Sequence, residues 1–252
     1  MKWLFYILIA ILFIWYLLRP FYKEGFYNGE GYPIDYYVIT MNSEERLSNI
    51  ADQQAKLTVP IQKIDAVVGA DVDIDDLVAK NVISPEFGNK TKRRRGEIGL
   101  YLSNLKIYNM IKEKGTPNGY SVILEDDFEI IDDDFENKIQ AALDVLQSVD
   151  FDMLYLQNNS NEYNKEATID KNHGVLIKDN IYYFDKNNYL FGTVGILINN
   201  KNIDRILDAT KYMDQQIDQK IQFAGIYDKL KLTMMYPNII DQRKNMVSII
   251  GN

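Results

Sequence analysis

The sequence predicts an α/β fold in which a mostly parallel sheet is flanked by helices. Short apolar segments with strand character alternate with segments whose apolar residues recur at helical spacing. Such alternation is typical of parallel sheets whose strands are joined by right-handed helical crossovers. With 252 residues, 46% of them hydrophobic, the chain can bury one sizeable core. We therefore expect ligands to bind beyond the carboxyl ends of the strands.

The N-terminal segment differs from the rest of the chain because it is almost wholly apolar. Residues Trp3 to Leu18 carry no charge and are followed by Arg19. This run is shorter than the roughly 20 residues of a typical span, but Phe21 and Tyr22 extend its apolar character. No small-residue cleavage site follows, which favours an uncleaved transmembrane anchor over residues 1–22 rather than a cleaved signal peptide. The run predicts a single-pass membrane protein. Because basic residues flank both ends of the run, the positive-inside rule does not indicate which side of the membrane the domain faces.

A linker is expected after the anchor, because residues 23–33 contain three glycines and Pro33. The folded domain is then expected to span residues 34–252. Each expected strand is a short apolar run bounded by turn residues. The expected strands are 34–40, 61–67, 120–124, 153–156, 174–177, 181–184, 192–199 and 231–236.

Helices are expected where apolar residues recur every three or four positions. The first follows a cap at Asn42 or Ser43 and runs to Lys56, and the others are 97–111, 135–146, 202–209 and 215–223. Residues 71–80 are expected to form a loop with a short helix. Residues 158–172 are polar and predict an exposed loop.

The composition excludes several kinds of catalytic chemistry. The chain has no cysteine, which excludes disulfides, zinc–thiolate sites and cysteine nucleophiles. It has one histidine, His173, in a polar stretch, so histidine-rich metal sites are excluded as well. A net charge of -8 argues against a nucleic-acid partner, since phosphate neutralisation needs clustered Lys and Arg. Chemistry based on carboxylates, hydroxyls and a metal ion remains.

Three adjacent acids, Glu125–Asp127, follow directly on the strand expected at 120–124. Mutual repulsion raises the pKa values of adjacent acids unless a cation compensates, and carboxylate oxygens suit Mg²⁺ or Mn²⁺. Residues 125 and 127 of an extended chain point to the same side, so both could approach one metal ion. The alternative is a solvated acidic turn, which is how we interpret Asp132–Asp134.

Several separated segments resemble one family in their order and spacing. They are Tyr37-Val38-Ile39-Thr40-Met41 with Arg46, Ala66-Val67-Val68-Gly69, Gly96-Glu97-Ile98-Gly99-Leu100-Tyr101-Leu102-Ser103-Asn104, Ile123-Leu124-Glu125-Asp126-Asp127, Gly192-Thr193-Val194-Gly195-Ile196-Leu197-Ile198, Gln216-Ile217-Asp218 and Pro237 to Gln242. Together they resemble glycosyltransferase family 25, the lipooligosaccharide-type glycosyltransferases that also include collagen galactosyltransferase domains. The third segment is similar to that family's G-E-I-G-C-x-L-S-H helix, and the fourth matches its I-L-E-D-D.

The resemblance implies a GT-A-like, Rossmann-type fold and an inverting, metal-dependent transfer of a hexose from a UDP-sugar. Galactose or glucose is the first choice of sugar, and the acceptor would be a glycan, a lipid-linked saccharide or a glycoprotein. Asp127 would hold Mn²⁺ or Mg²⁺, assisted by Glu125 or alternatively by Asp126. Asp218 would be the general base, with Glu125 as a second catalytic carboxylate. The residues expected to contact the donor are Thr40, Arg46, Glu97, Asp126, Gly192 and Thr193.

Structural roles compete with several of these assignments. Glu97 is favourable at the start of a helix, and Gly192 permits a turn or bulge. Arg46 and Asp218 could be ordinary residues on helix surfaces. The basic run Lys92–Arg95 could contact a diphosphate, an anionic acceptor or a membrane surface, or could be a solvated loop.

The chain departs from the family pattern at three positions. Val68 replaces an aspartate, Asn104 a histidine and Gln216 a proline. These departures favour one alternative function, a non-catalytic membrane-anchored module that binds a nucleotide or a sugar, whereas the intact acids disfavour it. A second alternative is a metal-dependent phosphodiesterase or nuclease that uses the same acids, against which the acidic net charge and the motif order both count.

Overall fold

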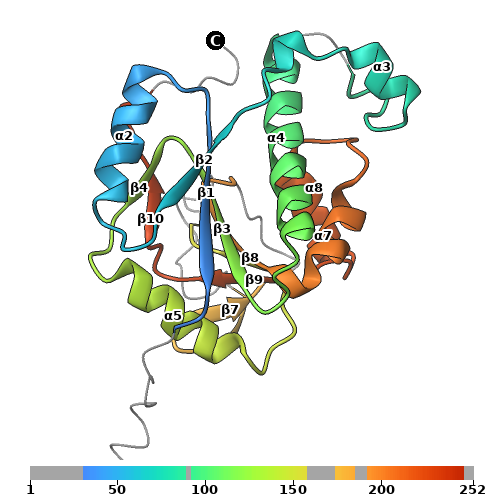
Figure 1. Ribbon diagram of the computed structural model, residues 1–252. Helices are drawn as coiled ribbons and strands as arrows, with labels where there is room; N and C mark the ends of the chain where they lie inside the picture. Colours follow the sequence, from blue (N-terminus) through green and yellow to red (C-terminus); the bar gives the residue numbers. More distant parts are fainter. Residues whose placement is uncertain (1–30, 89–91, 158–173, 185–191, 247–252) are drawn as a thin grey trace, which may run out of the picture. The chain divides into compact units, whose positions relative to one another are not determined.

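The computed structural model describes residues 31–88, 92–157, 174–184 and 192–246 (Figure 1). The chain divides into two units, Met1–Tyr32 and Pro33–Asn252, and all described helices and strands belong to the second. The predicted anchor, the polar loop expected at 158–172 and His173 lie outside the described residues. Within the described ranges, no helix is long and apolar enough to cross a membrane.

An eight-stranded sheet forms the centre of the domain, with the strand order β2-β1-β3-β8-β5-β9-β7-β6. The strands are β1 (Ile34–Thr40), β2 (Ile61–Asp65), β3 (Tyr120–Glu125), β5 (Met153–Tyr155), β6 (Val175–Lys178), β7 (Ile181–Tyr183), β8 (Gly195–Asn199) and β9 (Leu232–Met235). Each coincides with a strand expected from the sequence, and β1 has the expected bounds. These strand predictions are therefore confirmed to within a few residues at their ends.

The prediction of a mostly parallel sheet is wrong, because the sheet is mixed. β1 runs parallel to β2 and β3, and β5 runs parallel to β9. β8 lies antiparallel between β3 and β5, while β7 pairs antiparallel with both β6 and β9. A parallel connection needs a long crossover, usually a helix. The described residues between β5 and β8 form strands only, so the alternation of strands and helices fails in this part of the chain.

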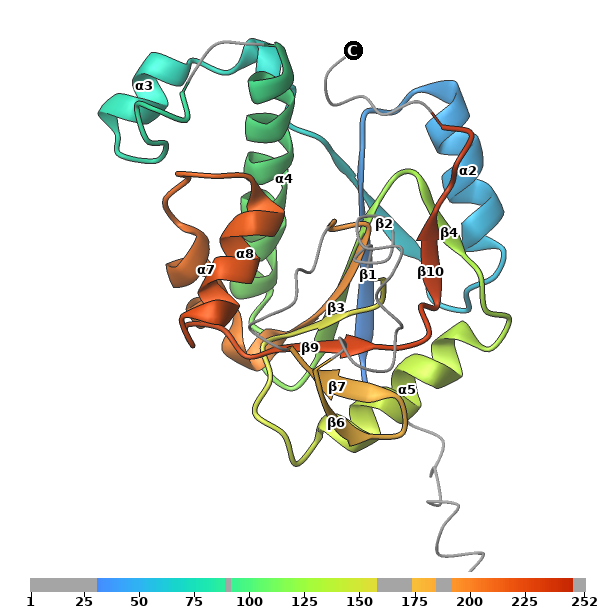
Figure 2. The same cartoon turned by 180° about the vertical axis from the view of Figure 1, so that it is seen from behind.

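Helices cover both faces of the sheet (Figures 1 and 2). They are α2 (Glu44–Gln54), α3 (Ile74–Ala79), α4 (Lys92–Lys114), α5 (Phe135–Leu146), α7 (Ile203–Thr210) and α8 (Ile217–Ile226), with 3-10 turns at Gly69–Asp71 and Asn200–Asn202. Both views place α2 and α5 on one side and α4, α7 and α8 on the other. The expected helices are confirmed; α5 has the expected bounds, and α4 extends beyond the expected helix at both ends.

Ser43 determines where α2 begins. Its side chain accepts a hydrogen bond from the backbone N–H of Arg46 at 3.4 Å, so the cap predicted at Asn42 or Ser43 is Ser43. Asn42, just before it, adopts the left-handed conformation with φ 58°. This start directs Arg46, Asn49 and Ile50 of α2 into the protein, where all three are buried.

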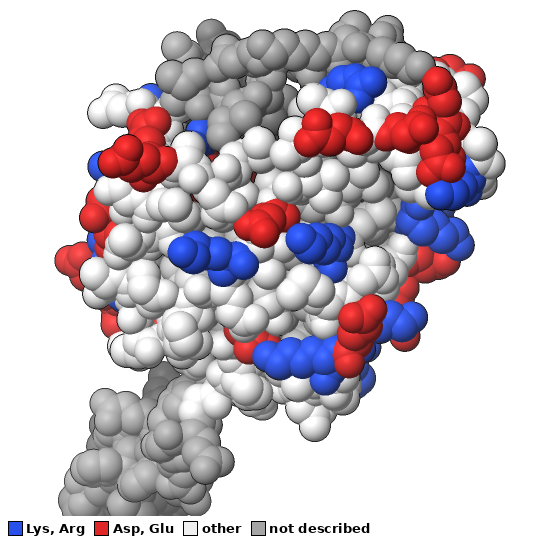
Figure 3. Space-filling model, turned by 45° about the horizontal axis from the view of Figure 1, so that its top comes forward, with Lys and Arg blue, Asp and Glu red and all other residues white. Residues whose placement is uncertain are grey.

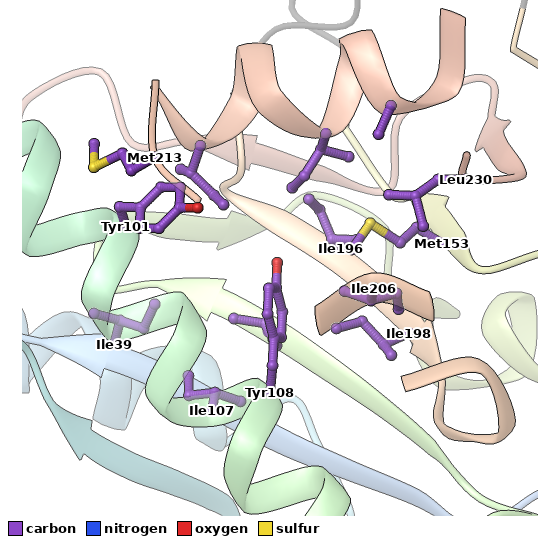
Figure 4. Packing of buried hydrophobic residues seen from close by; sticks show 14 of the residues in the cluster. Ile39, Tyr101, Ile107, Tyr108, Met153, Ile196, Ile198, Ile206, Met213 and Leu230 are labelled. Carbon is purple, nitrogen blue, oxygen red and sulfur yellow. The ribbon is translucent and has the colours of Figure 1, made fainter. Parts of the chain in front are cut away.

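The side chains of β1 alternate between two buried faces. Tyr37 and Ile39 join an apolar cluster with residues of α4, α7 and α8. Figure 4 shows this cluster, with Tyr108 of α4 among side chains from the sheet and from α7. On the opposite face, the ring of Tyr36 lies 6.4 Å from that of Phe135 in α5. Burial on both faces places β1 and its neighbours at the centre of the core.

A small second sheet pairs β4 (Phe128–Ile130) with β10 (Ile240–Gln242), and it was not expected from the sequence. The pairing is antiparallel, with Gln242 opposite Phe128. Each strand has 3 residues, which is too short for apolar periodicity to reveal. Gly195 leaves room for β10, because an added Cβ would lie 2.7 Å from Cδ1 of Ile240. The pairing brings β10 beside the acids that follow β3.

α4 approaches the segment after β2 so closely that glycine is needed on both sides. A Cβ added to Gly99 would lie 2.5 Å from the carbonyl oxygen of Val67. A Cβ added to Gly69 would lie 1.8 Å from that of Arg95. Ser103 links the two segments, since its Oγ accepts from Val67 N at 2.8 Å and donates to the Gly99 carbonyl at 2.7 Å. Two of the family-like segments therefore meet for reasons of packing.

Gly99→Ala should lower the free energy of unfolding by about 1–3 kcal/mol, because the added methyl overlaps backbone that cannot move aside. This cost outweighs the gain of roughly 1 kcal/mol that is expected because alanine has a higher helix propensity than glycine. Denaturant unfolding of the variant measures the loss. Gly119→Ala is the control, since a Cβ there meets its nearest atom at 3.4 Å. Equal free energies of unfolding for the two variants would show that the close approach of α4 to the segment after β2 does not require glycine at position 99.

Candidate functional site

The candidate site lies at the end of the sheet where β1 and β3 finish and β8 begins. β1 and β3 are parallel, with Ile39 opposite Glu125, so their carboxyl ends share one edge. β8 is antiparallel to β3, with Gly195 opposite Leu124, so the residues just before β8 join the same edge. Glu125 is the last residue of β3, and Asp126 and Asp127 follow it, so the three acids lie at the carboxyl end of a strand, where ligands bind in α/β sheets.

A buried ion-pair network joins Arg46 of α2 to two of the acids. Nη1 of Arg46 lies 2.9 Å from Oδ1 of Asp126 and 3.1 Å from Oδ2 of Asp127. The Arg46 side chain is only 4% exposed. The backbone N–H of Met41 and the hydroxyl of Thr40 also donate to Asp126. Burial raises the pKa of Asp126, and the charge of Arg46 opposes that shift.

Of the residues expected to contact the donor, Thr40 and Arg46 both contact Asp126. The interpretation of Arg46 as an ordinary surface residue is wrong, because its guanidinium is enclosed by the protein. The guanidinium of Arg46 lies beside Asp126 and Asp127 at the end of β3, which agrees with a role in the site. Direct contact of these three side chains with a donor stays a prediction.

Asp127 is held through one side-chain oxygen and through its backbone. Oδ2 accepts from Nε2 of Gln242 at 2.9 Å in addition to its ion pair with Arg46. The carbonyl oxygen of Asp127 accepts from the backbone N–H of Arg243 at 2.8 Å. Oδ1 is buried and has no hydrogen-bond partner among the described residues. A buried carboxylate oxygen without a partner costs free energy, and a bound cation would remove that cost.

Glu125 and Thr193 face each other across the boundary between β3 and β8. The Thr193 hydroxyl donates to Oε1 of Glu125. Burial, followed by repulsion from Asp127, raises the pKa of Glu125 to about 7. Gly192, directly before Thr193, adopts φ 84°, a conformation that other residues rarely take. The structure thus gives Gly192 a conformational role, and its contact with a donor stays a prediction.

Asp218 approaches the site from a different part of the chain. It lies in the first turn of α8 and is partly exposed, and its Oδ1 accepts from the N–H of Gln219 at 2.7 Å. Its charge contributes to the raised pKa of Glu125 and to that of Tyr155, so Asp218 lies within electrostatic reach of each of these two side chains. The role of Asp218 as general base stays a prediction, and so does the alternative of an ordinary polar residue on a helix surface.

Glu97 connects α4 to the start of α8. The expectation that Glu97 opens a helix is wrong, because α4 begins at Lys92. One carboxylate oxygen of Glu97 accepts from Nε2 of Gln216, and the other accepts from Arg94 at 2.7 Å. Gln216 immediately precedes α8, so this contact fixes the helix start beside Asp218. A contact between Glu97 and a donor stays a prediction.

The basic run Lys92–Arg95 forms the first turn of α4, so the alternative of a solvated loop is wrong. The guanidinium carbon of Arg94 lies 3.8 Å from the ring centre of Phe87. Arg95 donates to three backbone carbonyls in the segment 69–72 at 3.0–3.1 Å. Figure 3 shows acidic and basic side chains interspersed on the face that it presents. The absence of a nucleic-acid partner stays a prediction.

Asn49 is a site residue that the sequence analysis missed. Its side-chain amide donates to the carbonyls of Asp126 at 3.0 Å and Phe128 at 2.9 Å, and its oxygen accepts from Arg243 at 2.7 Å. It therefore links α2 and the C-terminal segment to the backbone that carries the acids. Its position one turn of helix after Arg46 was the only local signal for this role.

Two carboxylates, those of Asp127 and Glu125, fit a divalent cation. Oδ1 of Asp127 is buried and has no hydrogen-bond partner among the described residues. The charge of Asp127 raises the pKa of Glu125, so the two carboxylates lie close enough to interact. Among the described residues, no three or more acidic or histidine side chains are grouped to hold a metal ion by themselves. Mg²⁺ is commonly held by one or two carboxylates together with substrate phosphates. A cation shared with a diphosphate agrees with this donor set.

Arg46→Met should lower the free energy of unfolding by about 3–5 kcal/mol, because it leaves two buried carboxylates without their cation. Lys138→Met is the matched control, since the pair of Lys138 with Asp132 is partly exposed and such pairs contribute about 1 kcal/mol or less. Chemical unfolding of both variants gives the comparison. Similar losses for the two variants would contradict a buried network.

The stability of the domain should depend on the ionisation of Glu125. Folding raises the pKa of Glu125 from 4.5 to about 7, so the folded state binds the proton more tightly. The stabilisation of the folded state by this bound proton is complete below pH 4.5, and it is lost as the pH rises to about 7. Glu125→Gln should therefore gain about 1–3 kcal/mol relative to the parent between pH 4.5 and pH 8, measured by urea unfolding in EDTA. A difference that does not vary with pH would refute the shift.

The comparison with known families agrees with this arrangement. Residues 34–221 match the sequence model of glycosyltransferase family 25, described as LPS biosynthesis protein. A search among curated proteins finds no match. The matched region carries Arg46, Glu97, the acids of Glu125–Asp127 and Asp218, and it ends before β9 and β10. Because the match covers well over half of the 252 residues, the chain belongs to glycosyltransferase family 25 and is a glycosyltransferase.

Proposed function

We propose that this glycosyltransferase moves galactose or glucose from a UDP-sugar to a glycan, a lipid-linked saccharide or a glycoprotein. The transfer inverts the anomeric carbon and depends on Mn²⁺ or Mg²⁺, on a GT-A-like fold. The observation that carries the proposal is the unpartnered Oδ1 of Asp127 within the acids at the carboxyl end of β3. The diphosphate of a nucleotide sugar is the ligand that requires a cation at such a site.

Asp127 and Glu125 are the residues that would hold the cation. When bound, the cation neutralises charge on the diphosphate leaving group. Arg46 keeps Asp126 and Asp127 in place and balances part of their charge. Asn49 holds the backbone on which the acids are carried. These contacts pre-organise the acids before a donor arrives, which is the protein's main contribution in such reactions.

Asp218 is the proposed general base. In an inverting transfer, the acceptor hydroxyl loses its proton while its oxygen bonds to the anomeric carbon and the bond to the diphosphate breaks. Asp218 is partly exposed, and the contact of Glu97 with Gln216 fixes the helix start that carries it. Glu125 is the second candidate when it does not bind the cation, because burial and repulsion from Asp127 raise its pKa to about 7 in the metal-free protein, which suits proton transfer near neutral pH.

The departures from the family pattern leave the acids undisturbed, which supports an active enzyme over a binding module. Asn104 is buried and donates to the Leu100 carbonyl at 2.9 Å within α4. Val68 is 39% exposed on the segment after β2. Gln216 makes the contact with Glu97, which a proline could not make.

We also propose that residues 1–22 anchor the enzyme in a membrane, which would keep it near lipid-linked or surface glycans. The apolar run from Trp3 to Leu18 supports this proposal. The full chain should sediment with membranes and resist extraction by alkaline carbonate, whereas a chain that starts at residue 31 should not. Release of the full chain from membranes by alkaline carbonate would refute the anchor.

Asp127→Asn should lower the rate of UDP release from the preferred donor at least about 100-fold, because it removes the charge that faces the cation. UDP-galactose, UDP-glucose and UDP-N-acetylhexosamines are compared with Mn²⁺ and with EDTA, using the full chain in detergent. Asp133→Asn, in the exposed acidic run before α5, is the control and should keep full activity. Activity that survives both EDTA and Asp127→Asn would refute the proposed mechanism. Cleavage of a phosphodiester substrate without any turnover of nucleotide sugars would instead favour the phosphodiesterase alternative.

A further inference from the structure

The two side-chain oxygens of Asp127 have opposite environments. Oδ2 is held by Nη1 of Arg46 at 3.1 Å and by Nε2 of Gln242 at 2.9 Å. Oδ1 is buried and has no hydrogen-bond partner among the described residues. A carboxylate with two donors on one oxygen cannot rotate freely about its Cβ–Cγ bond. The position of Oδ1 is therefore fixed by what holds Oδ2.

The two donors to Oδ2 come from segments far apart in the sequence. Arg46 is also paired with Asp126, so it serves both aspartates. Gln242 is the last residue of β10, and its side-chain amide donates a hydrogen bond to Asp127. An uncharged amide can orient a carboxylate without cancelling its charge, whereas a second Arg or Lys would repel an incoming cation.

β10 is anchored independently of the Asp127 side chain. It pairs with β4, and Ile240 is fully buried against Gly195. Nε2 of Gln157 donates to Oδ1 of Asp241 at 3.1 Å, and the backbone N–H of Arg243 donates to the carbonyl of Asp127. The side chain of Gln242 is thus delivered to Asp127 by a strand that has its own contacts with the core.

We propose that Gln242 is a positioning residue, which together with Arg46 holds Oδ2 of Asp127 so that Oδ1 is presented to the divalent cation. This inference rests on the proposed function, in which Asp127 binds that cation. It makes β10, which lies beyond the family match at residues 34–221, a working part of the site. Removing an outer hydrogen-bond partner of a metal ligand typically weakens metal binding by about 10- to 100-fold.

The test compares two Gln→Met substitutions of nearly equal shape in the full chain. Gln242→Met removes only the hydrogen bond to Asp127, and Gln157→Met removes only a contact that holds β10. Mn²⁺ binding is measured by electron paramagnetic resonance of free Mn²⁺ in the absence of any donor, and thermal unfolding is followed by circular dichroism. We expect Gln242→Met to raise the Kd for Mn²⁺ about 10-fold or more. Gln157→Met should leave that Kd unchanged, although it should lower the Tm by about as much as Gln242→Met does.

In donor hydrolysis, Gln242→Met should shift the Mn²⁺ concentration for half-maximal rate upward by the same factor as the Kd. If Gln242→Met binds Mn²⁺ as tightly as the parent, or if Gln157→Met weakens binding equally, the positioning role is refuted and Gln242 only supports β10. Should Gln242→Met fail to fold, Gln242→Asn keeps an amide that is too short to reach Oδ2 and is expected to raise the Kd in the same way. Mn²⁺ binding that is unchanged in Asp127→Asn would refute the proposed metal site itself, which separates the two failures.

Discussion

The structure of the site depends on the buried guanidinium of Arg46. Three acids in sequence at the end of a central strand would repel one another, and burial would add to the cost. Arg46 lies between Asp126 and Asp127 and balances part of that charge within the protein. Its place is set by the Ser43 cap, which starts α2 at the turn after β1. The carboxyl ends of β1 and β3 are thereby joined by an ion pair as well as by the sheet.

Around this ion pair the site is assembled from segments that are far apart in the sequence. Thr193 enters from the antiparallel strand β8, Asp218 from the first turn of α8, and Gln242 from β10. α8 is tied to α4 by the contact of Gln216 with Glu97. Rigid elements therefore hold each polar group in place, which is the condition for pre-organised catalysis. The proposed roles of Asp127, Glu125 and Asp218 all require this convergence.

The sequence allowed the strands and helices to be located well, because long apolar runs and helical periodicity are local signals. β1 and α5 have the bounds expected from them. The direction of β8 was not predicted, because an apolar run does not say which neighbour a strand will join. β4 and β10 were missed because strands of 3 residues are too short to show a period. The segments around Gly69 and Gly99 were recognised as family-like, but only the structure shows that they pack against each other.

The sequence by itself determined the family, and it pointed to Glu125–Asp127 as the centre of the candidate site, since acids at the end of a buried strand have few structural explanations. The tertiary structure decided which of these acids are paired and which oxygen is left without a partner. It showed that Arg46 is enclosed, that Glu97 holds a helix start, and that Asn49 and Gln242 support the acids. These facts depend on contacts between residues up to 194 positions apart, as between Asn49 and Arg243, and no local pattern encodes such pairings.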